Sequence, residues 1–335
     1  MIDDIAAFLG AALVSWILTG AVRRYALRSD LMDVPNERSL HRTPIPRGGG
    51  AAIALVTLAG LGVAALLGRV PADIAWPLGV GGALVAGVGW LDDRRGVPVS
   101  VRAVVHAAAA CWAAYWIWGE ITPAAIAGVV CIIWAINLYN FMDGIDGLAG
   151  GEAASVGLIA GALFLGAGRG DLALVAFLVA AAAAGFLGWN WPPARIFMGD
   201  VGSGFLGFTF GVLSLLADRS GALPLPLGLL LAGVFAFDAT ATVVRRMARG
   251  EHWTQAHRSH AYQRLVQSGS THADVTIGVL LVNLGLGALA WLAQSGRLSV
   301  EAAVLAGIVV LTVLYLAIER RRPMFSDAPV RPTLP

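Results

Sequence analysis

The sequence predicts an all-α membrane protein with about eleven transmembrane helices. Its 335 residues are 58% hydrophobic and 13% charged, whereas soluble domains are about 45–50% apolar and about 25% charged. Hydrophobic runs of roughly 20 residues, the length that crosses a bilayer at about 1.5 Å rise per residue, recur along the whole chain. The mean hydropathy of +0.75 agrees with these runs, so we expect most of the chain to lie in lipid.

The expected spans follow one another with polar breaks between them. The first run has no basic segment before it and is followed by further spans, so we expect a first transmembrane helix rather than a cleaved signal peptide. The eleven runs cover residues 5–22, 48–68, 74–91, 102–118, 122–139, 152–168, 172–189, 203–217, 222–243, 273–293 and 299–318.

The polar breaks alternate between short turns and longer loops. The longer loops are residues 23–47, 92–101, 140–151, 190–202 and 244–272, followed by a tail at 321–335. All 23 basic residues are Arg, and only four of them fall in the short turns. The positive-inside rule therefore places the five long loops and the tail in the cytosol and the N-terminus in the periplasm. We expect a single transmembrane domain over residues 1–320.

Composition excludes several classes of function. The net charge of +2 gives no indication of a nucleic-acid partner, and the lack of Lys rules out a P-loop phosphate site. Cys111 and Cys131 lie inside apolar runs, which argues against a disulfide framework and a thiolate metal site. Glycines at 79–82 and 204–211 predict close helix packing in the membrane.

Two acidic clusters stand at the cytosolic ends of the third and fifth runs. Asp92 and Asp93 are adjacent carboxylates that repel unless a cation or proton offsets them, which indicates a metal site or a general base. A solvated span end is an equally good explanation. In the second cluster, Asp143 and Asp146 are three residues apart and are expected on one side of a helical turn, among glycines that let backbone approach a ligand. The alternative there is an ordinary Asp–Gly turn.

Three further loops carry groups suited to phosphate. Asp200 opens the eighth run as either a simple N-cap or a Mg²⁺ ligand beside a helix N-terminus that cradles phosphate. His257 and His260 have helical i,i+3 spacing and could meet a pyrophosphate; zinc is a weaker alternative that would need ligands such as Glu251 and His252. The loop at 30–47 is either an anion site or a contact with lipid headgroups.

All five clusters lie on the cytosolic face, while the other face has only short turns. Independent solvated loops would not be distributed so unevenly. We therefore expect one shared site in which carboxylates hold one or two hard cations and Arg and His meet phosphates. Such a site at the membrane surface implies one soluble phosphate compound and one lipid as substrates.

The motifs that make up these clusters resemble a known family. DVPNERSLHRTPIPRGGG (33–50), GWLDDRRG (89–96), NLYNFMDGIDGLAGGE (137–152), WNWPPARIFMGDVGSGFLGF (189–208) and AHRSHAYQRL (256–265) occur in the order found in the polyprenyl-phosphate N-acetylhexosamine-1-phosphate transferases, glycosyltransferase family 4. The similarity extends over about residues 1–320. Within the family, the eleven-span layout is similar to the O-antigen-initiating branch that uses UDP-N-acetylglucosamine and related sugars.

The resemblance implies a catalytic membrane domain that transfers a sugar-1-phosphate from a UDP-N-acetylhexosamine to undecaprenyl phosphate and releases UMP. It further implies Mg²⁺ or Mn²⁺ as cofactor, the bilayer as a partner, and a bacterial inner-membrane location with the site facing the cytosol. We also expect a homodimer. A transporter or flippase and a phosphatase acting on polyprenyl-linked phosphates are the alternatives.

The resemblance also assigns roles to individual residues. The catalytic candidates are Asp92, Asp93, Asp143, His257 and His260, with Asp93 the better candidate to activate the lipid phosphate. The metal candidates are Asp200, Asp93 and Asp143. The substrate-binding candidates are Arg47, Arg102, Asn140, Asp146, Asn190, Phe197 and Arg258, with Asp146 expected near uridine and Phe197 expected to stack on uracil. The last loop lacks the run of consecutive His found in the peptidoglycan branch, which argues against a muramyl-pentapeptide donor.

Overall fold

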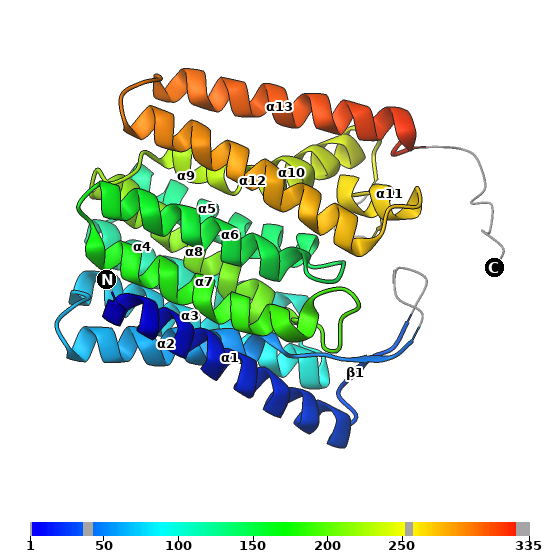
Figure 1. Cartoon of the computed structure of the whole chain (residues 1–335), viewed down its shortest axis with the longest axis horizontal. Coiled ribbons are helices and arrows are strands. Elements are labelled where there is room, and N and C mark those ends of the chain that lie inside the picture. The colour runs from blue at the N-terminus through cyan, green and yellow to red at the C-terminus, as the bar shows by residue number, and fades with distance from the viewer. Residues whose placement is uncertain (1, 36–42, 252–256, 326–335) are drawn as a thin grey trace.

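A computed structural model describes residues 2–35, 43–251 and 257–325, and this part of the chain is helical apart from one short strand pair. The long helices lie side by side along one direction, so that α1 begins at one end of the bundle and α13 finishes at the other (Figure 1). The strands are β1 (Met32–Asp33) and β2 (Ile45–Pro46), which pair antiparallel. The helices are α1 (Ile2–Arg28), α2 (Gly50–Leu66), α3 (Ala72–Arg95), α4 (Val99–Trp118), α5 (Pro123–Met142), α6 (Leu148–Gly166), α7 (Gly170–Asn190), α8 (Asp200–Arg219), α9 (Leu225–Leu231), α10 (Gly233–Ala248), α11 (Ala261–Gln267), α12 (His272–Gln294) and α13 (Val300–Arg321).

Apart from the ninth, each expected apolar run lies on one helix, which confirms the all-α polytopic class. Within the described ranges, eight helices are long and apolar enough to cross a membrane, or nine if one bent pair is a single span. The helix α2 has only 17 residues, and α4 carries Arg102 and His106 in its first half, so neither is among the eight.

The ninth expected span is wrong as a continuous helix. The run at 222–243 is broken into α9 and α10, which meet at an angle of 86°. The break lies beside Gly233, where a Cβ atom would come within 3.0 Å of Leu286 on α12 and 3.2 Å of Leu311 on α13. These neighbours approach the bend closely, and a hydrophobicity pattern does not record such an approach.

The long polar loops are shorter than expected because the helices continue into them. The helix α1 extends to Arg28, and α3 extends to Arg95, so only three residues separate α3 from α4. The basic stretch at 243–248 forms the last part of α10. The polar side chains of these loops are therefore held on rigid helix ends.

The centre of the bundle is α8, which is buried over nearly its whole length and packs on α3 and α5. Glycines make this packing possible, as predicted. A side chain at Gly81 on α3 would clash with Phe208, and one at Gly207 would clash with the backbone of Ala135 on α5. This close contact of α3, α5 and α8 brings their polar ends together.

Candidate active site

A network of charged hydrogen bonds joins α3, α4, α5 and α8 at one end of the bundle. The Arg102 guanidinium on α4 donates to Asp92 at 2.5 Å and to Asp200 at 2.8 Å. The Asn140 amide on α5 donates to the other oxygen of Asp200 at 2.9 Å and to Ser203 at 3.3 Å. Four predicted site residues from four helices are therefore in one network, although 108 positions separate the first from the last.

The Asp93 carboxylate caps the N-terminus of α8. It is 2% exposed and accepts hydrogen bonds from the backbone N–H groups of Asp200 (3.0 Å) and Val201 (3.1 Å). A carboxylate at this position is stabilised by the helix dipole. The simple explanation that Asp200 is the N-cap is therefore wrong, because Asp93 performs that role and leaves the Asp200 side chain for Arg102 and Asn140.

Arg47, in the segment before α2, and Phe197, in the loop before α8, also lie at this end of the bundle. The Arg47 guanidinium donates to the backbone oxygen of Asp93, and its buried Nε makes no hydrogen bond to the residues that the structure describes. The backbone of Phe197 donates to Pro46 at 2.8 Å and accepts from Gly49 at 2.9 Å, which joins the loop before α8 to the segment before α2. The Phe197 ring is half-buried, and its predicted stacking on uracil stays a prediction.

The turn after α5 separates Asp143 from Asp146. The expected helical turn is wrong, because α5 ends at Met142 and the backbone of Asp143 is not helical. Asp146 accepts from the backbone N–H of Ala194 at 2.9 Å and lies 3.3 Å from His272 Nδ1. The two carboxylates therefore have different surroundings, and Asp146 is held to the 190–199 loop and α12.

Among the acidic site candidates, Asp143 is the one whose negative charge is least compensated by hydrogen bonds. It makes no hydrogen bond to another residue that the structure describes. Burial raises the pKa of Asp143 to about 8, and the negative charges of Asp200 and Asp93 raise it further in the same direction. At pH 7 Asp143 therefore keeps its proton unless a cation lies beside it.

Asn190, the last residue of α7, links the loop before α8 to the turn before α6 through hydrogen bonds. It is 4% exposed, accepts from Gly147 N–H at 2.9 Å and donates to the Ile196 carbonyl at 2.9 Å. These contacts give Asn190 a structural role, and its predicted place near the nucleotide sugar stays a prediction.

The His motif packs against the end of α5. His257 and His260 precede α11 and are not on a helical turn as expected, but their ring centroids are 4.9 Å apart. The His260 ring stacks on Phe141 at 6.3 Å, directly beside Asn140. Burial, helped by nearby His260 and Arg246, lowers the pKa of His257 to about 4, so this ring is neutral at pH 7.

Arg258, the remaining predicted phosphate contact, has an exposed side chain in the same segment. Its backbone carbonyl accepts from Gln267 at 2.9 Å, which ties the segment to the end of α11. The contact of its guanidinium with substrate stays a prediction.

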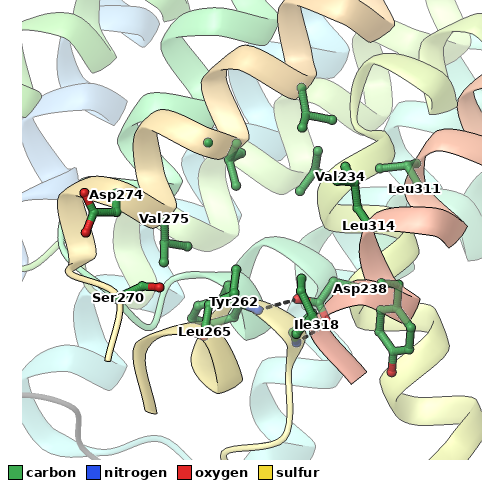
Figure 2. A pocket seen from close by; sticks show the side chains of 15 residues that line it. Val234, Asp238, Tyr262, Leu265, Ser270, Asp274, Val275, Leu311, Leu314 and Ile318 are labelled. Carbon is green, nitrogen blue, oxygen red and sulfur yellow. Dashed lines mark hydrogen bonds between the residues drawn. The ribbon is translucent and has the colours of Figure 1, made fainter. Parts of the chain in front are cut away.

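An apolar cavity lies next to the His motif. It has a volume of about 340 Å³ and is lined mainly by aliphatic side chains of α10, α12 and α13, with Tyr262 and Leu265 of α11 on one side (Figure 2). Asp238, Ser270 and Asp274 are among its polar lining residues. The cavity therefore joins an apolar region to the polar end of the bundle.

Sequence reasoning missed three buried polar contacts. His272 pairs with Asp146. In the sequence, His272 follows the capping residue Thr271 and indicates only the start of a helix. Glu152 on α6 accepts from Asn283 on α12 at 2.6 Å. An acidic residue and an amide inside separate apolar runs were the available signal, since polar groups in spans need partners.

The third missed contact is Asp238, which lies inside the ninth apolar run. It contacts Thr242 and the segment 260–262, and the distance between these parts of the sequence hides the pairing.

No group of three or more His, Cys, Asp and Glu side chains within the described ranges is arranged to hold a metal. The zinc alternative has no support from these residues, and His252 lies outside the described ranges. A site for Mg²⁺ requires less, because this ion is usually bound by one or two carboxylates together with waters and substrate phosphates. The donor chemistry and the uncompensated charge at Asp143 fit such an ion.

Comparisons with known proteins agree with the motif resemblance. The family model described as "Glycosyl transferase family 4" matches residues 75–218. The chain is 30% identical to the decaprenyl-phosphate N-acetylglucosaminephosphotransferase of Mycobacterium leprae, over 86% of this chain and 82% of that protein. It is also 30% identical to the undecaprenyl-phosphate alpha-N-acetylglucosaminyl 1-phosphate transferase of Yersinia pestis, over 85% and 82%. It is 33% identical to the phospho-N-acetylmuramoyl-pentapeptide-transferase of Moorella thermoacetica, but over only 48% of this chain and 46% of that protein.

Proposed function

Because the chain belongs to glycosyl transferase family 4, we propose that it transfers an N-acetylhexosamine-1-phosphate from a UDP-sugar to undecaprenyl phosphate and releases UMP. The product would begin a lipid-linked glycan such as O-antigen. The similarity to the muramyl-pentapeptide enzyme extends over only half of either chain, which favours a simple N-acetylhexosamine donor.

One observation carries this proposal. Arg102 bridges Asp92 and Asp200 while Asn140 holds the same Asp200, so that four helix ends form a single polar surface. A surface of this kind presents carboxylates and guanidinium groups together, as transfer between two phosphate compounds requires. The apolar cavity beside α11 supports the lipid half of the proposal, because an isoprenoid chain needs an apolar path to the polar end.

We propose that Mg²⁺, or Mn²⁺ in its place, joins the site with the donor. Asp143 and Asp200 would hold it, with Asp93 behind them. When bound, the ion would neutralise charge on the pyrophosphate and on the departing UMP. The observation behind this assignment is that burial, together with the charges of Asp200 and Asp93, raises the pKa of Asp143 to about 8, so that its ionised form needs a cation.

The residues of the chain would then orient the two phosphates. In the proposed reaction an oxygen of the lipid phosphate attacks the β-phosphorus, the phosphorus bonded to the sugar, and the bond to the UMP oxygen breaks. Both oxygens of Asp93 already accept backbone N–H groups. This favours a one-step attack, in which Asp93 holds the start of α8 in place. It argues against a two-step route in which Asp93 forms a covalent adduct.

The proposed membrane arrangement has eleven crossings, with α9 and α10 together making one of them and α2 and α4 included. The N-terminus would be periplasmic and the site cytosolic, because the long, Arg-rich breaks lie at the end that holds the site. A homodimer in the bacterial inner membrane completes the proposal.

The experiment incubates purified protein with undecaprenyl phosphate, Mg²⁺ and a panel of UDP-N-acetylhexosamines and measures UMP. Release of UMP with one donor, abolished in Asp200→Ala without loss of folding, would support the transferase. Release of inorganic phosphate from the lipid would instead support a phosphatase. No UMP with any donor would overturn the proposal and leave the flippase alternative.

A further inference from the structure

Asp238 is a buried carboxylate on α10 that none of the roles above requires. It is 5% exposed. One of its oxygens accepts from Ala261 N–H at 2.8 Å and from the Thr242 hydroxyl at 3.1 Å, and the other accepts from Tyr262 N–H at 3.1 Å. Figure 2 shows the bonds to the start of α11. Asp238 therefore caps α11 from a neighbouring helix.

The same carboxylate faces a catalytic candidate. His260 is 3% exposed, and its Nδ1 lies 3.5 Å from Asp238 Oδ1, too long for a good hydrogen bond but close enough for electrostatic attraction. The His260 Nδ1 atom is buried and makes no hydrogen bond within the described part of the chain. A carboxylate beside Nδ1 favours the tautomer that carries its proton there, which leaves Nε2 as an acceptor.

His260 is also fixed to the end of α5 that carries the site. Its ring stacks on Phe141 at 6.3 Å and on Tyr262 at 5.7 Å, and the Tyr262 hydroxyl donates to the Phe141 carbonyl at 3.1 Å. Phe141 stands between Asn140 and Asp143 in the sequence. The contacts of Asp238 with the backbone at 261–262 thus set the position of a His ring that adjoins the carboxylate network.

We propose that Asp238 is a positioning residue, which holds His260 in the Nδ1–H tautomer and orients it against α5 so that Nε2 can accept a proton or hydrogen bond from a substrate phosphate. This inference rests on the proposed transferase function. The bend between α9 and α10 fits this scheme. The helix α10 carries Asp238 toward the polar end, while α9 packs on α8, α12 and α13.

The kinetic test is a double-mutant cycle of Asp238→Asn and His260→Gln, read as kcat and KM for UMP release. The Asn variant keeps an oxygen for Ala261 but removes the charge beside the ring. We expect it to lower kcat by about 10–100-fold, as loss of a group that orients a functional His does, and to leave KM within about threefold. In the His260→Gln background the second substitution should cost nothing further. Full additivity of the two losses would overturn the proposal.

Asp218→Asn is the matched control. Asp218 caps α9 by accepting from Leu225 N–H at 2.7 Å. It lies at the opposite end of α8 from Asp200 and does not line the cavity, so its loss should leave kcat unchanged. An equal fall of kcat in this variant would show that cap removal alone causes the effect.

A second measurement needs no turnover. In protein labelled with ¹⁵N-histidine, the six His residues give few signals, and His260→Gln identifies that of His260. We expect wild-type His260 to show the Nδ1–H tautomer and Asp238→Asn to shift it toward Nε2–H, with no shift in Asp218→Asn. A wild-type signal of the Nε2–H tautomer would overturn the inference even if the protein proved to be no transferase. The expected signal in a protein that releases no UMP would refute the proposed function alone.

Discussion

Gly199→Ala tests whether the position of the Asp93 carboxylate is required for activity. Gly199 has φ +75° and ψ 171°, a region that is almost restricted to glycine, and a side chain there costs of the order of 1–3 kcal/mol. Its Cβ would also lie 2.5 Å and 2.8 Å from the two oxygens of Asp93. Because ordinary contacts with a Cβ begin at 3.4 Å, the carboxylate would have to move.

The expected loss of activity follows from that movement. A displacement of about 1 Å at a reacting site can cost about 100-fold in rate, which corresponds to about 2.7 kcal/mol. We therefore expect kcat for UMP release to fall by about that factor in Gly199→Ala. The unfolding midpoint in detergent should fall modestly, and the protein should remain folded.

Gly168→Ala supplies the control for backbone strain. Gly168 also has φ +75°, but it follows α6 at the other end of the bundle, and a Cβ added there would meet nothing within 4 Å. We expect it to lose stability without losing activity. The reasoning would be refuted if Gly199→Ala kept kcat within threefold of wild type, or if it lowered kcat further in an Asp93→Ala background.

Three other predictions concern separate parts of the molecule. Arg102→Ala removes the cation between two carboxylates, so UMP release should fall by about 100-fold, while Arg94→Ala, whose guanidinium lies over the Tyr25 ring, should stay near wild type. Glu152→Ala leaves Asn283 without its carboxylate partner and should lower the unfolding free energy by about 1–3 kcal/mol, whereas Glu152→Gln, which can exchange two hydrogen bonds with Asn283, should unfold near the wild-type midpoint. The pKa of His257 is lowered from 6.5 to about 4, so folded protein binds this proton less readily than unfolded protein. Stability should be full above pH 6.5 and fall toward pH 4, and His257→Gln should flatten that part of the midpoint-against-pH curve.

The sequence was sufficient to predict which helix ends carry the site, but not how their side chains pair. The hydrophobic runs and the Arg distribution identified Asp92 and Asp200 as candidates on one face, the family resemblance added Asn140, and the structure joins all three. That Asp93 caps α8 in place of Asp200 depends on the closeness of α3 and α8, since the two residues are 107 positions apart. A local pattern of N-cap residues cannot record a cap supplied by another helix.

The same limitation explains the errors in the turns. Spacing of three residues predicted a shared helical face for Asp143 and Asp146, and likewise for the two His residues of the last loop. In both cases the two residues lie outside the neighbouring helix, since α5 ends at Met142 and α11 begins at Ala261. Tertiary contacts then determine where their side chains lie. Asp146 turns toward Ala194 and His272, while the His rings stay close because His260 packs on Phe141.

The broken helix and the buried acids would also be expected of a transporter, whose substrates bind near the bilayer midplane on interrupted helices. Their partners argue otherwise. Asp238, one turn beyond the break, directs both oxygens to the start of α11, and Glu152 bonds to Asn283 on α12. Each acid is thus engaged in holding one helix to another. Among the acidic site candidates, Asp143 makes no such contact within the described residues, and it lies at the polar end near Asp200 and Asp93. Ionisation of Asp143 is therefore unfavourable unless a cation joins it at the polar end, which favours the proposed transferase over a transporter with a site at the bilayer midplane.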